Sequence, residues 1–414
     1  MLPPATPEIE RHRSRALATY FTAAALTSIA YIATFTVASI AAPEMTGSAG
    51  SSGWPSAIAV AGTALAASLL SSVMARRGRR AGIVLGLSVA VAGGALAVLA
   101  VTAASLPLLL IASALVGFGN AAMNLSRYAA ADLFPVERRA GALGFVVWGS
   151  TIGAVVGPNL VAPAGSVAPS IDLVPLAGGL AMAFVFLLAA LGVAALGPRA
   201  PIQPHLDEPT RAAGQRPPSQ RRLLAELVRT PRGRTAIIAL VTSQLVMTLI
   251  MTMTPYHLHA EGHGLGTVGL VISAHTFGMF AFSPLSGRLT DRFGANAMIL
   301  AGFSVLAASG VISALPIAGV TLAIPMFLLG IGWNLGFVAG SSLLASEAPL
   351  GDRARLQGAS DAVVWATAAA ASFSSGYVVA TASFALLAII GTAVAVLLAV
   401  VVVLDARASR PVSA

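Results

Sequence analysis

Cysteine and lysine are absent from this chain, and charged side chains make up only 9% of its 414 residues. Without cysteine, the protein can hold neither a disulfide scaffold nor a thiolate metal site. Soluble domains carry about 25% charged residues, so most of this chain must face surroundings that do not favour charge. Glycine-rich phosphate loops, catalytic triads and paired catalytic carboxylates are also missing from the sequence, and we therefore expect a protein that is not an enzyme.

Long apolar runs account for the missing charge. The chain is 57% hydrophobic, and the runs Ile83–Ala104, Leu176–Leu196 and Phe384–Leu404 each approach or exceed the roughly 20 residues with which a helix crosses hydrocarbon. Alternating patterns of the barrel kind are absent, so the backbone hydrogen bonds must be formed within helices. The sequence predicts an all-α membrane protein that crosses the bilayer several times.

Hydropathy and helix length divide the chain into twelve expected spans. Six of them precede, and six follow, a polar segment rich in proline and arginine that we interpret as a linker. The predicted domains are a six-helix bundle over 1–196, a cytoplasmic linker over 197–234 and a second six-helix bundle over 235–414. The expected spans are Ala16–Ala42, Pro55–Ala75, Ala81–Ala103, Pro107–Ala131, Ala140–Ala162, Leu173–Leu196, Thr235–Tyr256, Gly266–Ser286, Asn296–Leu315, Gly319–Leu344, Leu356–Ala380 and Ser383–Leu404.

All 24 cationic side chains are arginines, and their distribution predicts the orientation of the spans. If the N-terminus is cytoplasmic, every arginine except Arg127 falls in a tail or in a connection on the cytoplasmic side. The longer outward connections, Pro43–Trp54, Pro163–Asp172 and His257–Leu265, contain none. This asymmetry is the positive-inside bias, and it predicts a multi-pass protein of the cytoplasmic membrane with both termini inside. It also excludes nucleic acid as a partner, because the basic residues do not form one patch.

The two halves of the chain repeat one another. Residues Ser71–Gly78 align with Gly287–Gly294, and both stretches lie between the second and third spans of their half. Asp132, at the inner end of the fourth span, aligns with Glu347 at the end of the tenth. A parallel duplication of a six-span unit predicts two pseudo-symmetric bundles with a substrate site between them near mid-membrane.

The stretch Gly287-Arg-Leu-Thr-Asp-Arg-Phe-Gly294 resembles the loop signature of the major facilitator superfamily, and its copy at 71–80 keeps Arg76 and Gly78. The resemblance implies the major facilitator fold and a secondary active transporter that works by alternating access. Ser113 stands near the place where drug exporters of this superfamily carry an arginine, and this departure argues against drug efflux.

The same resemblance implies a gate built from the loop residues. We expect Arg292 to pair with Glu347 and Arg76 with Asp132. We expect Asp291 to accept hydrogen bonds at a helix N-terminus, where the helix dipole stabilises a negative charge. Such ion pairs keep one side of the transporter closed and break when the two bundles rotate relative to each other. Alternatively, the arginines only determine the membrane topology. The gating candidates are Gly287, Arg288, Asp291, Arg292, Gly294, Arg76, Gly78, Asp132 and Glu347.

Sulfur and imidazole side chains recur on the seventh and eighth spans. Met247 and Met251 are four residues apart and share a helix face, and so do His275 and Met279. Thioether and imidazole are ligands that Cu(I) prefers where no thiolate is available. The paired pattern resembles the CcoA-like copper importer branch of the superfamily, and this resemblance implies copper uptake. These four side chains are the predicted substrate or metal site, presented to one shared spot.

Other interpretations of this site stay open. Methionine is an ordinary filler of apolar helices. His275 is an ionisable group inside a span, and it can also carry a proton or bond an organic substrate. The same motif-bearing group includes proteins that take up riboflavin. The alternative function is therefore an organic solute carrier, for riboflavin-like uptake or drug efflux.

Polar residues inside other spans supply two more candidates. Asn120, Asn124 and Arg127 recur at i, i+4 and i+7 of the fourth span, so they face one way and are predicted to line the cavity. Arg127 can instead reach the inner boundary with its long side chain. Asp361, about two turns into the eleventh span, is the candidate for a coupling proton.

Histidines cluster on the outer turn after the seventh span. His257, His259 and His263 are candidates for collecting metal at the mouth, or they belong to a solvated loop. We expect no cofactor, since copper enters only as a possible substrate. The expected partners are the lipid bilayer and a small-molecule or metal-ion substrate, and the expected state is a monomer.

Overall fold

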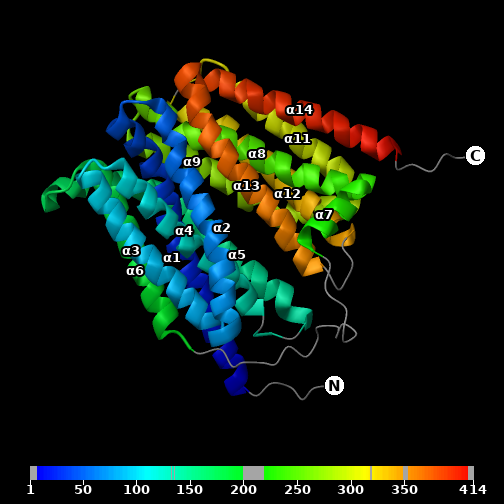
Figure 1. Ribbon diagram of the computed structural model, residues 1–414, viewed down its shortest axis with the longest axis horizontal. Coiled ribbons are helices and arrows are strands. Elements are labelled where there is room, and N and C mark those ends of the chain that lie inside the picture. The colour runs from blue at the N-terminus through cyan, green and yellow to red at the C-terminus, as the bar shows by residue number, and fades with distance from the viewer. Residues whose placement is uncertain are drawn as a thin grey trace, which may run out of the picture. The chain divides into compact units, whose positions relative to one another are not determined.

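The computed structural model describes residues 7–131, 133–134, 136–198, 219–317, 319–347 and 353–408, which fold almost entirely into helices (Figure 1). No β-strand occurs within these ranges. Twelve helical segments are long and apolar enough to cross a membrane, and each overlaps one of the expected spans. The predicted all-α fold with twelve spans is therefore confirmed. Helices suit hydrocarbon because each satisfies its own backbone donors and acceptors.

The helices follow one another with short connections. They are α1 (Pro7–Thr46), η1 (Ala49–Gly53), α2 (Trp54–Arg77), α3 (Arg79–Thr102), α4 (Leu106–Ala131), α5 (Val136–Val167), η2 (Ala168–Ile171), α6 (Pro175–Leu196), α7 (Gln220–Arg229), α8 (Pro231–Ala260), α9 (Leu265–Phe280), α10 (Ser283–Phe293), α11 (Ala295–Ser313), η3 (Gly319–Leu322), α12 (Ala323–Glu347), α13 (Arg353–Thr381) and α14 (Phe384–Ala408).

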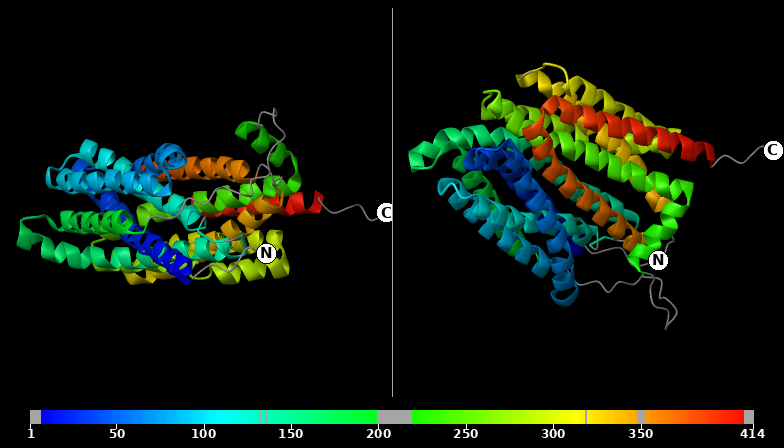
Figure 2. Two further views of the ribbon diagram at one scale, coloured as in Figure 1. Left: turned by 90° about the horizontal axis from the view of Figure 1, so that it is seen from below. Right: turned by 45° about the horizontal axis from the view of Figure 1, so that its top comes forward.

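Contacts between Cα atoms divide the chain into two compact units. Unit 1 contains Met1–Pro204 and Leu258–Ser273, and unit 2 contains His205–His257 and Ala274–Ala414. In unit 1, α1 packs on α4, α5 and α6, while α4 also packs on α2 and α3. In unit 2, α11 packs on α12 and α14, and α11 and α14 run side by side in yellow and red (Figure 2). The domain boundaries expected from the sequence stay a prediction.

One close helix contact occurs in the same form in both units. A Cβ atom on Gly117 of α4 would lie 2.8 Å from the backbone nitrogen of Thr63 on α2. A Cβ atom on Gly330 of α12 would lie 2.8 Å from the backbone nitrogen of Met279 on α9. Each glycine therefore lets two helices approach backbone to backbone. The repeat makes Thr63 and Met279 equivalent positions.

The loop signature adopts the same backbone conformation in both units. Gly78 ends α2 and begins α3 with φ 87° and ψ 160°. Gly294 ends α10 and begins α11 with φ 84° and ψ 152°. Because side chains rarely tolerate this positive φ, both positions require glycine. This agreement supports the internal duplication that the sequence predicted.

Two elements differ from the sequence expectation. The eighth expected span is broken, because α9 ends at Phe280 and Pro284 occupies the first turn of α10, where its missing N–H is harmless. The expected linker also holds structure: α7 lies within it, and α8 begins at Pro231. Leu223 and Leu227 of α7 are buried, and α7 packs on α13.

Candidate functional site

All four predicted soft-ligand side chains lie in unit 2 and are buried. Met247 and Met251 lie on α8, and their exposed fractions are 9% and 6%. His275 and Met279 lie on α9, with exposed fractions of 1% and 9%. A side chain that faced lipid would be exposed in the protein alone. These four side chains therefore point into protein.

His275 has one ring nitrogen that is bonded and one that is not. Its Nδ1 lies 3.0 Å from the backbone carbonyl oxygen of Met326 on α12. Because a carbonyl can only accept, Nδ1 carries the proton and donates it. In the neutral ring Nε2 then keeps its lone pair, and this atom is buried without a hydrogen-bond partner among the described residues. A buried, unpartnered imidazole nitrogen is a candidate ligand or proton acceptor.

A buried polar chain connects α12 with α8. The indole Nε1 of Trp333 donates to Oε1 of Gln244 at 3.0 Å, and Nε2 of Gln244 donates to Oγ1 of Thr248 at 3.1 Å. The Thr248 hydroxyl lies 4.0 Å from Sδ of Met247. The Trp333 ring stacks on Phe337 with centroids 4.6 Å apart. One candidate thioether is thus next to an amide and an aromatic surface.

These groups form a column along α8, α9 and α12. Met326, which holds His275, and Trp333 are two helical turns apart on α12, about 10 Å. Oγ1 of Thr254 on α8 lies 3.3 Å from Sδ of Met326, so α8 also meets α12 at the level of His275. These contacts therefore place His275 and Met247 at two levels of one column, whereas the sequence suggested a single spot.

The repeat relates this column to a polar centre in unit 1. Asn120 and Trp333 each stand three residues after the close-packed glycine of their helix. Thr63 and Met279 are the matching positions on α2 and α9. Unit 1 therefore carries a hydroxyl and an amide where unit 2 carries a thioether and an indole.

The stripe predicted on the fourth span lies on α4, and Asn120, Asn124 and Arg127 are all half-buried. Nδ2 of Asn120 lies 3.5 Å from Oγ1 of Thr63 on α2. Asn120 therefore belongs to a polar contact of α2 and α4. The cavity-lining role of the stripe stays a prediction.

The three outer histidines have separate partners. His257 stacks on an aromatic ring of α14 with centroids 4.2 Å apart. Nε2 of His259 lies 3.0 Å from a carboxylate oxygen of Glu44 on α1, and Nε2 of His263 lies 4.0 Å from Glu261. In the parts of the chain that the structure describes, no three His, Asp or Glu side chains gather as a metal site. Their collecting role stays a prediction.

The predicted gate shows a different ion pair. Glu347, at the end of α12, pairs with Arg232 of the first turn of α8 at 2.9 Å, whereas the sequence predicted Arg292 as its partner. Arg292 lies over the ring of Phe293, 5.3 Å from the centroid. Arg232 is available because α8 begins four residues earlier than the expected span. Asp132 lies outside the described residues, so its pairing with Arg76 stays a prediction.

Other gating candidates are solvent-accessible. Asp291 lies in the last turn of α10, three residues before Gly294, which precedes α11. Its expected role at a helix N-terminus stays a prediction. Arg76 and Arg288 are exposed, and nothing approaches the missing Cβ of Gly287. Asp361, the coupling candidate, is an exposed residue of α13.

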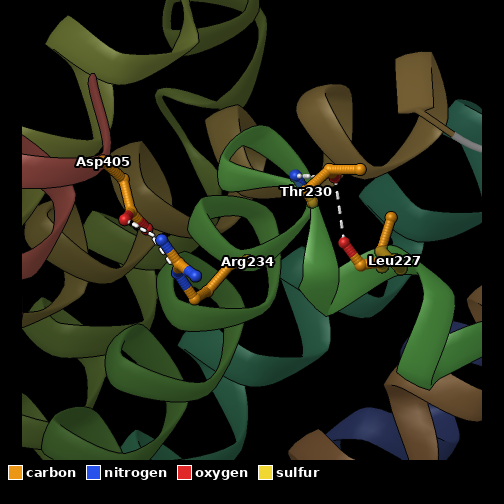
Figure 3. Close-up of polar contacts among 5 residues, drawn as sticks. Leu227, Thr230, Arg234 and Asp405 are labelled. Carbon is orange, nitrogen blue, oxygen red and sulfur yellow. Dashed lines mark hydrogen bonds and ion pairs between the residues drawn. The ribbon is translucent and has the colours of Figure 1, made fainter. Parts of the chain in front are cut away.

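A second ion pair at this end of unit 2 was not predicted. Arg234 of α8 makes two hydrogen bonds to the carboxylate of Asp405 on α14 (Figure 3). Next to it, Thr230 donates to the carbonyl oxygen of Leu227 and accepts from the backbone of Gly233. These contacts tie the corner between α7 and α8 to α14.

Gln244 and Trp333 are the site residues that sequence reasoning missed. Each has a feature in the sequence that could have indicated a site residue. Gln244 is an uncharged amide within the seventh apolar span, and Trp333 is a polar aromatic within the tenth. Neither signal specifies a partner, because the two residues are 89 positions apart.

Solved structures share this fold. A bacterial homologue of the human lysosomal transporter Spinster, in an inward-facing and occupied conformation, superposes with a TM-score of 0.72 at 15% identity, covering 96% of this chain and 97% of the other. A POT family transporter in complex with a thioalcohol-conjugated peptide gives 0.69 at 13% identity, covering 96% and 97%. At these identities, the likeness shows that the chain shares the fold of these proteins.

Sequence comparison specifies the family. The chain belongs to the Major Facilitator Superfamily, which it matches over residues 20–267 and 236–414. It is 35% identical over 353 residues to the uncharacterized MFS-type transporter YddS of Bacillus subtilis (strain 168), covering 83% of this chain and 80% of YddS. It is 30% identical over 312 residues to the riboflavin transporter RfnT of Brucella anthropi, covering 73% of both proteins. The resemblance to the superfamily is confirmed, and a copper-importing relative is not among these proteins.

Proposed function

We propose that this transporter carries a small organic solute with a planar aromatic ring system, of the riboflavin type, by alternating access in the cytoplasmic membrane. The observation that supports this proposal is the buried column of unit 2, in which the Trp333 indole, the Gln244 amide and the Phe337 ring lie together. The relationship to RfnT adds independent support. The chain itself needs no cofactor for this work and acts as a monomer.

Ring stacking and amide bonding suit such a solute. An indole or phenyl face stacks on a planar heterocycle, while an amide offers one acceptor and two donors to its polar edge. Gln244 is bonded within the protein in this structure, so a substrate edge replaces one of these bonds when it binds. A neutral solute fits a column without charged side chains, because burying an unpaired charge is costly.

The test uses a riboflavin-auxotrophic bacterium that lacks its own transporter. Expression of this chain should restore growth on low riboflavin and accumulation of labelled riboflavin. Gln244→Leu should reduce accumulation about tenfold or more, since an unpaired buried polar group costs about 1–3 kcal/mol. Gly192→Ala is the matched control, because nothing approaches its missing Cβ. No accumulation at normal expression would contradict the riboflavin assignment, and accumulation only in everted vesicles would reverse the direction.

Copper uptake is the second candidate, and one observation favours it. Nε2 of His275 is buried without a hydrogen-bond partner among the described residues, and Met247, Met251 and Met279 are buried in the same unit. Imidazole and thioether are soft donors that suit Cu(I). Cells that express the chain should then accumulate copper, and His275→Ala should abolish the gain. His12→Ala, near the start of α1, serves as the imidazole control outside the column. Copper accumulation that is the same with and without His275 would exclude this candidate.

The remaining site predictions belong to this proposal. Asp361 is the candidate for a coupling proton, and a proton gradient should drive transport less effectively in Asp361→Asn. Met247, Met251 and Met279 contact either substrate class as polarizable surface. The proposal has both termini on the cytoplasmic side, in accordance with the arginine distribution.

A further inference from the structure

A surface groove runs between α11 and α14 of unit 2. It encloses about 630 Å³. Its floor is Phe303, which is only 1% exposed. Ser304 and Ala307 line one wall, Val396 and Val400 the other, and Arg407 stands at one end. The groove lies outside the column described above.

The shape of the groove follows from how the two helices pack. At the far end of the groove from Arg407, a Cβ on Gly310 would meet the side chain of Thr392, closer than real Cβ atoms come to any neighbour. The Thr392 hydroxyl also donates to the carbonyl oxygen of Ala307 at 3.3 Å. Backbone contact at Gly310 closes this end. Beyond Ala307 the groove runs along Phe303 and Val400 toward Arg407.

The wall on α14 is built to face lipid. An 18-residue window of its span has a mean hydropathy of 3.1, and only 28% of that window is buried, the lowest share of the twelve candidate spans in the described residues. Val396, Val400 and Leu404 follow one another at intervals of four and are each more than half exposed. An exposed apolar stripe beside an apolar groove favours a hydrocarbon chain as occupant.

Length and charge specify the occupant further. From Val396 to Arg407 the helix rises about 16 Å, which matches half of a hydrocarbon core of about 30 Å. Arg407 is exposed and pairs with no carboxylate within the described ranges, whereas Asp405 nearby is already held by Arg234. A single cation at the end of a groove one leaflet deep complements a chain that ends in an anionic head group.

We propose that this groove is a binding site for an anionic phospholipid, with one acyl chain against Phe303 and Val400 and the phosphate at Arg407. The guanidinium bonds phosphate oxygens in pairs. The predicted orientation brings Arg407 to the cytoplasmic leaflet, where anionic lipids concentrate. The proposal does not depend on which solute is carried.

Native mass spectrometry of the purified full-length protein tests the site. After partial delipidation, it should retain phosphatidylglycerol in preference to phosphatidylcholine. Arg407→Gln should lower this preference about fivefold, the factor that corresponds to about 1 kcal/mol for one arginine at a lipid surface. Arg229→Gln, which removes an exposed arginine of α7 outside the groove, should leave the preference unchanged.

A second variant tests the apolar part separately. Ala399 lines the groove, and Ala399→Phe should reduce retention of both lipids. Ala308→Phe, at an exposed position of α11 outside the lining, is the volume control. Equal lipid preference in Arg407→Gln and the unaltered protein overturns the proposal. Cross-linking that shows a second copy of the chain seated on α14 also overturns it. Folding of each variant is checked by its melting temperature, so loss of structure is not mistaken for loss of lipid.

Discussion

At the scale of single residues, the bond between Gln244 and the Trp333 indole joins α8 to α12 inside unit 2. Gln244→Leu leaves the indole N–H buried without an acceptor, which costs about 1–3 kcal/mol. In a Trp333→Phe background this donor is absent, so the same change should cost less. A double-mutant cycle of melting temperatures in detergent measures the difference. Equal losses in the two backgrounds would show that the bond contributes nothing.

The close-packed glycines make a second residue-scale prediction. In Gly330→Ala the new methyl group meets the backbone oxygen of His275, which cannot move out of the way as a side chain could. The expected loss of stability is about 1–3 kcal/mol. Gly117→Ala, at the equivalent position of unit 1, should lose a similar amount.

Gly192→Ala is the control for both glycine variants. Nothing lies within 4 Å of its missing Cβ, so the change should be neutral or stabilising by up to about 1 kcal/mol, the helix propensity difference. Thermal unfolding of the three variants gives the comparison. If Gly330→Ala is as stable as Gly192→Ala, the backbones of α9 and α12 are far enough apart at Gly330 to accommodate a methyl group.

Sequence reasoning reached some of these residues and missed others for a physical reason. Helical spacing revealed the pairs Met247–Met251 and His275–Met279, because local periodicity survives in the sequence. It could not reveal that His275 bonds the carbonyl of Met326. That bond joins residues 51 positions apart, and backbone acceptors carry no sequence signal. Partner choice therefore requires tertiary structure.

At the scale of elements, hydrophobic runs predicted every span, since burial in lipid demands about 20 apolar residues whatever the neighbours. The break between α9 and α10 was missed, although Pro284 marks it. The helix α7 was missed because a polar, proline-rich segment dominated the composition around it. Its signal was the pair Leu223 and Leu227 at i and i+4, which are buried in the structure.

The ion pair between α8 and α14 gives an element-scale prediction. The Asp405 side chain is 7% exposed, while the Arg234 side chain is 43% exposed. Arg234→Gln leaves the buried Asp405 carboxylate without its ion-pair partner. Asp405→Asn leaves Arg234 unpaired, but its exposed guanidinium can be hydrated. Arg234→Gln should therefore lower the melting temperature more.

Arg222→Gln supplies the control for this pair. Arg222 bonds Glu226 within α7 at 2.8 Å, but both side chains are largely exposed at 73% and 51%. An exposed pair of this kind contributes little, so this variant should change the melting temperature least. If Asp405→Asn lowered the melting temperature more than Arg234→Gln, the Asp405 carboxylate would be solvated in the protein.

At the scale of the whole molecule, the duplication explains how one fold holds two different centres. Gly78 and Gly294 share a conformation, and Gly117 and Gly330 share a helix contact. Backbone positions that only glycine can occupy are thus kept in both copies. The side chains beside them have diverged to a polar centre in unit 1 and an aromatic, thioether-rich column in unit 2.

The orientation of the whole chain is open to a direct test, because it contains no cysteine and each introduced cysteine is the only thiol. Ser48→Cys, after α1, and Glu261→Cys, after α8, should react with a membrane-impermeant maleimide in intact cells. Arg77→Cys, at the end of α2, and Arg221→Cys, on α7, should react only after the membrane is permeabilised. All four positions are exposed in the structure, so access is decided by the membrane. The physical reason is that arginines resist translocation and are retained in the cytoplasm. The opposite pattern of labelling would show that the chain is inverted and that Arg407 lies in the outer leaflet. Labelling of all four positions in intact cells would show that the cells are leaky. A cytoplasmic protein with an exposed thiol, labelled in parallel, checks for such leakage.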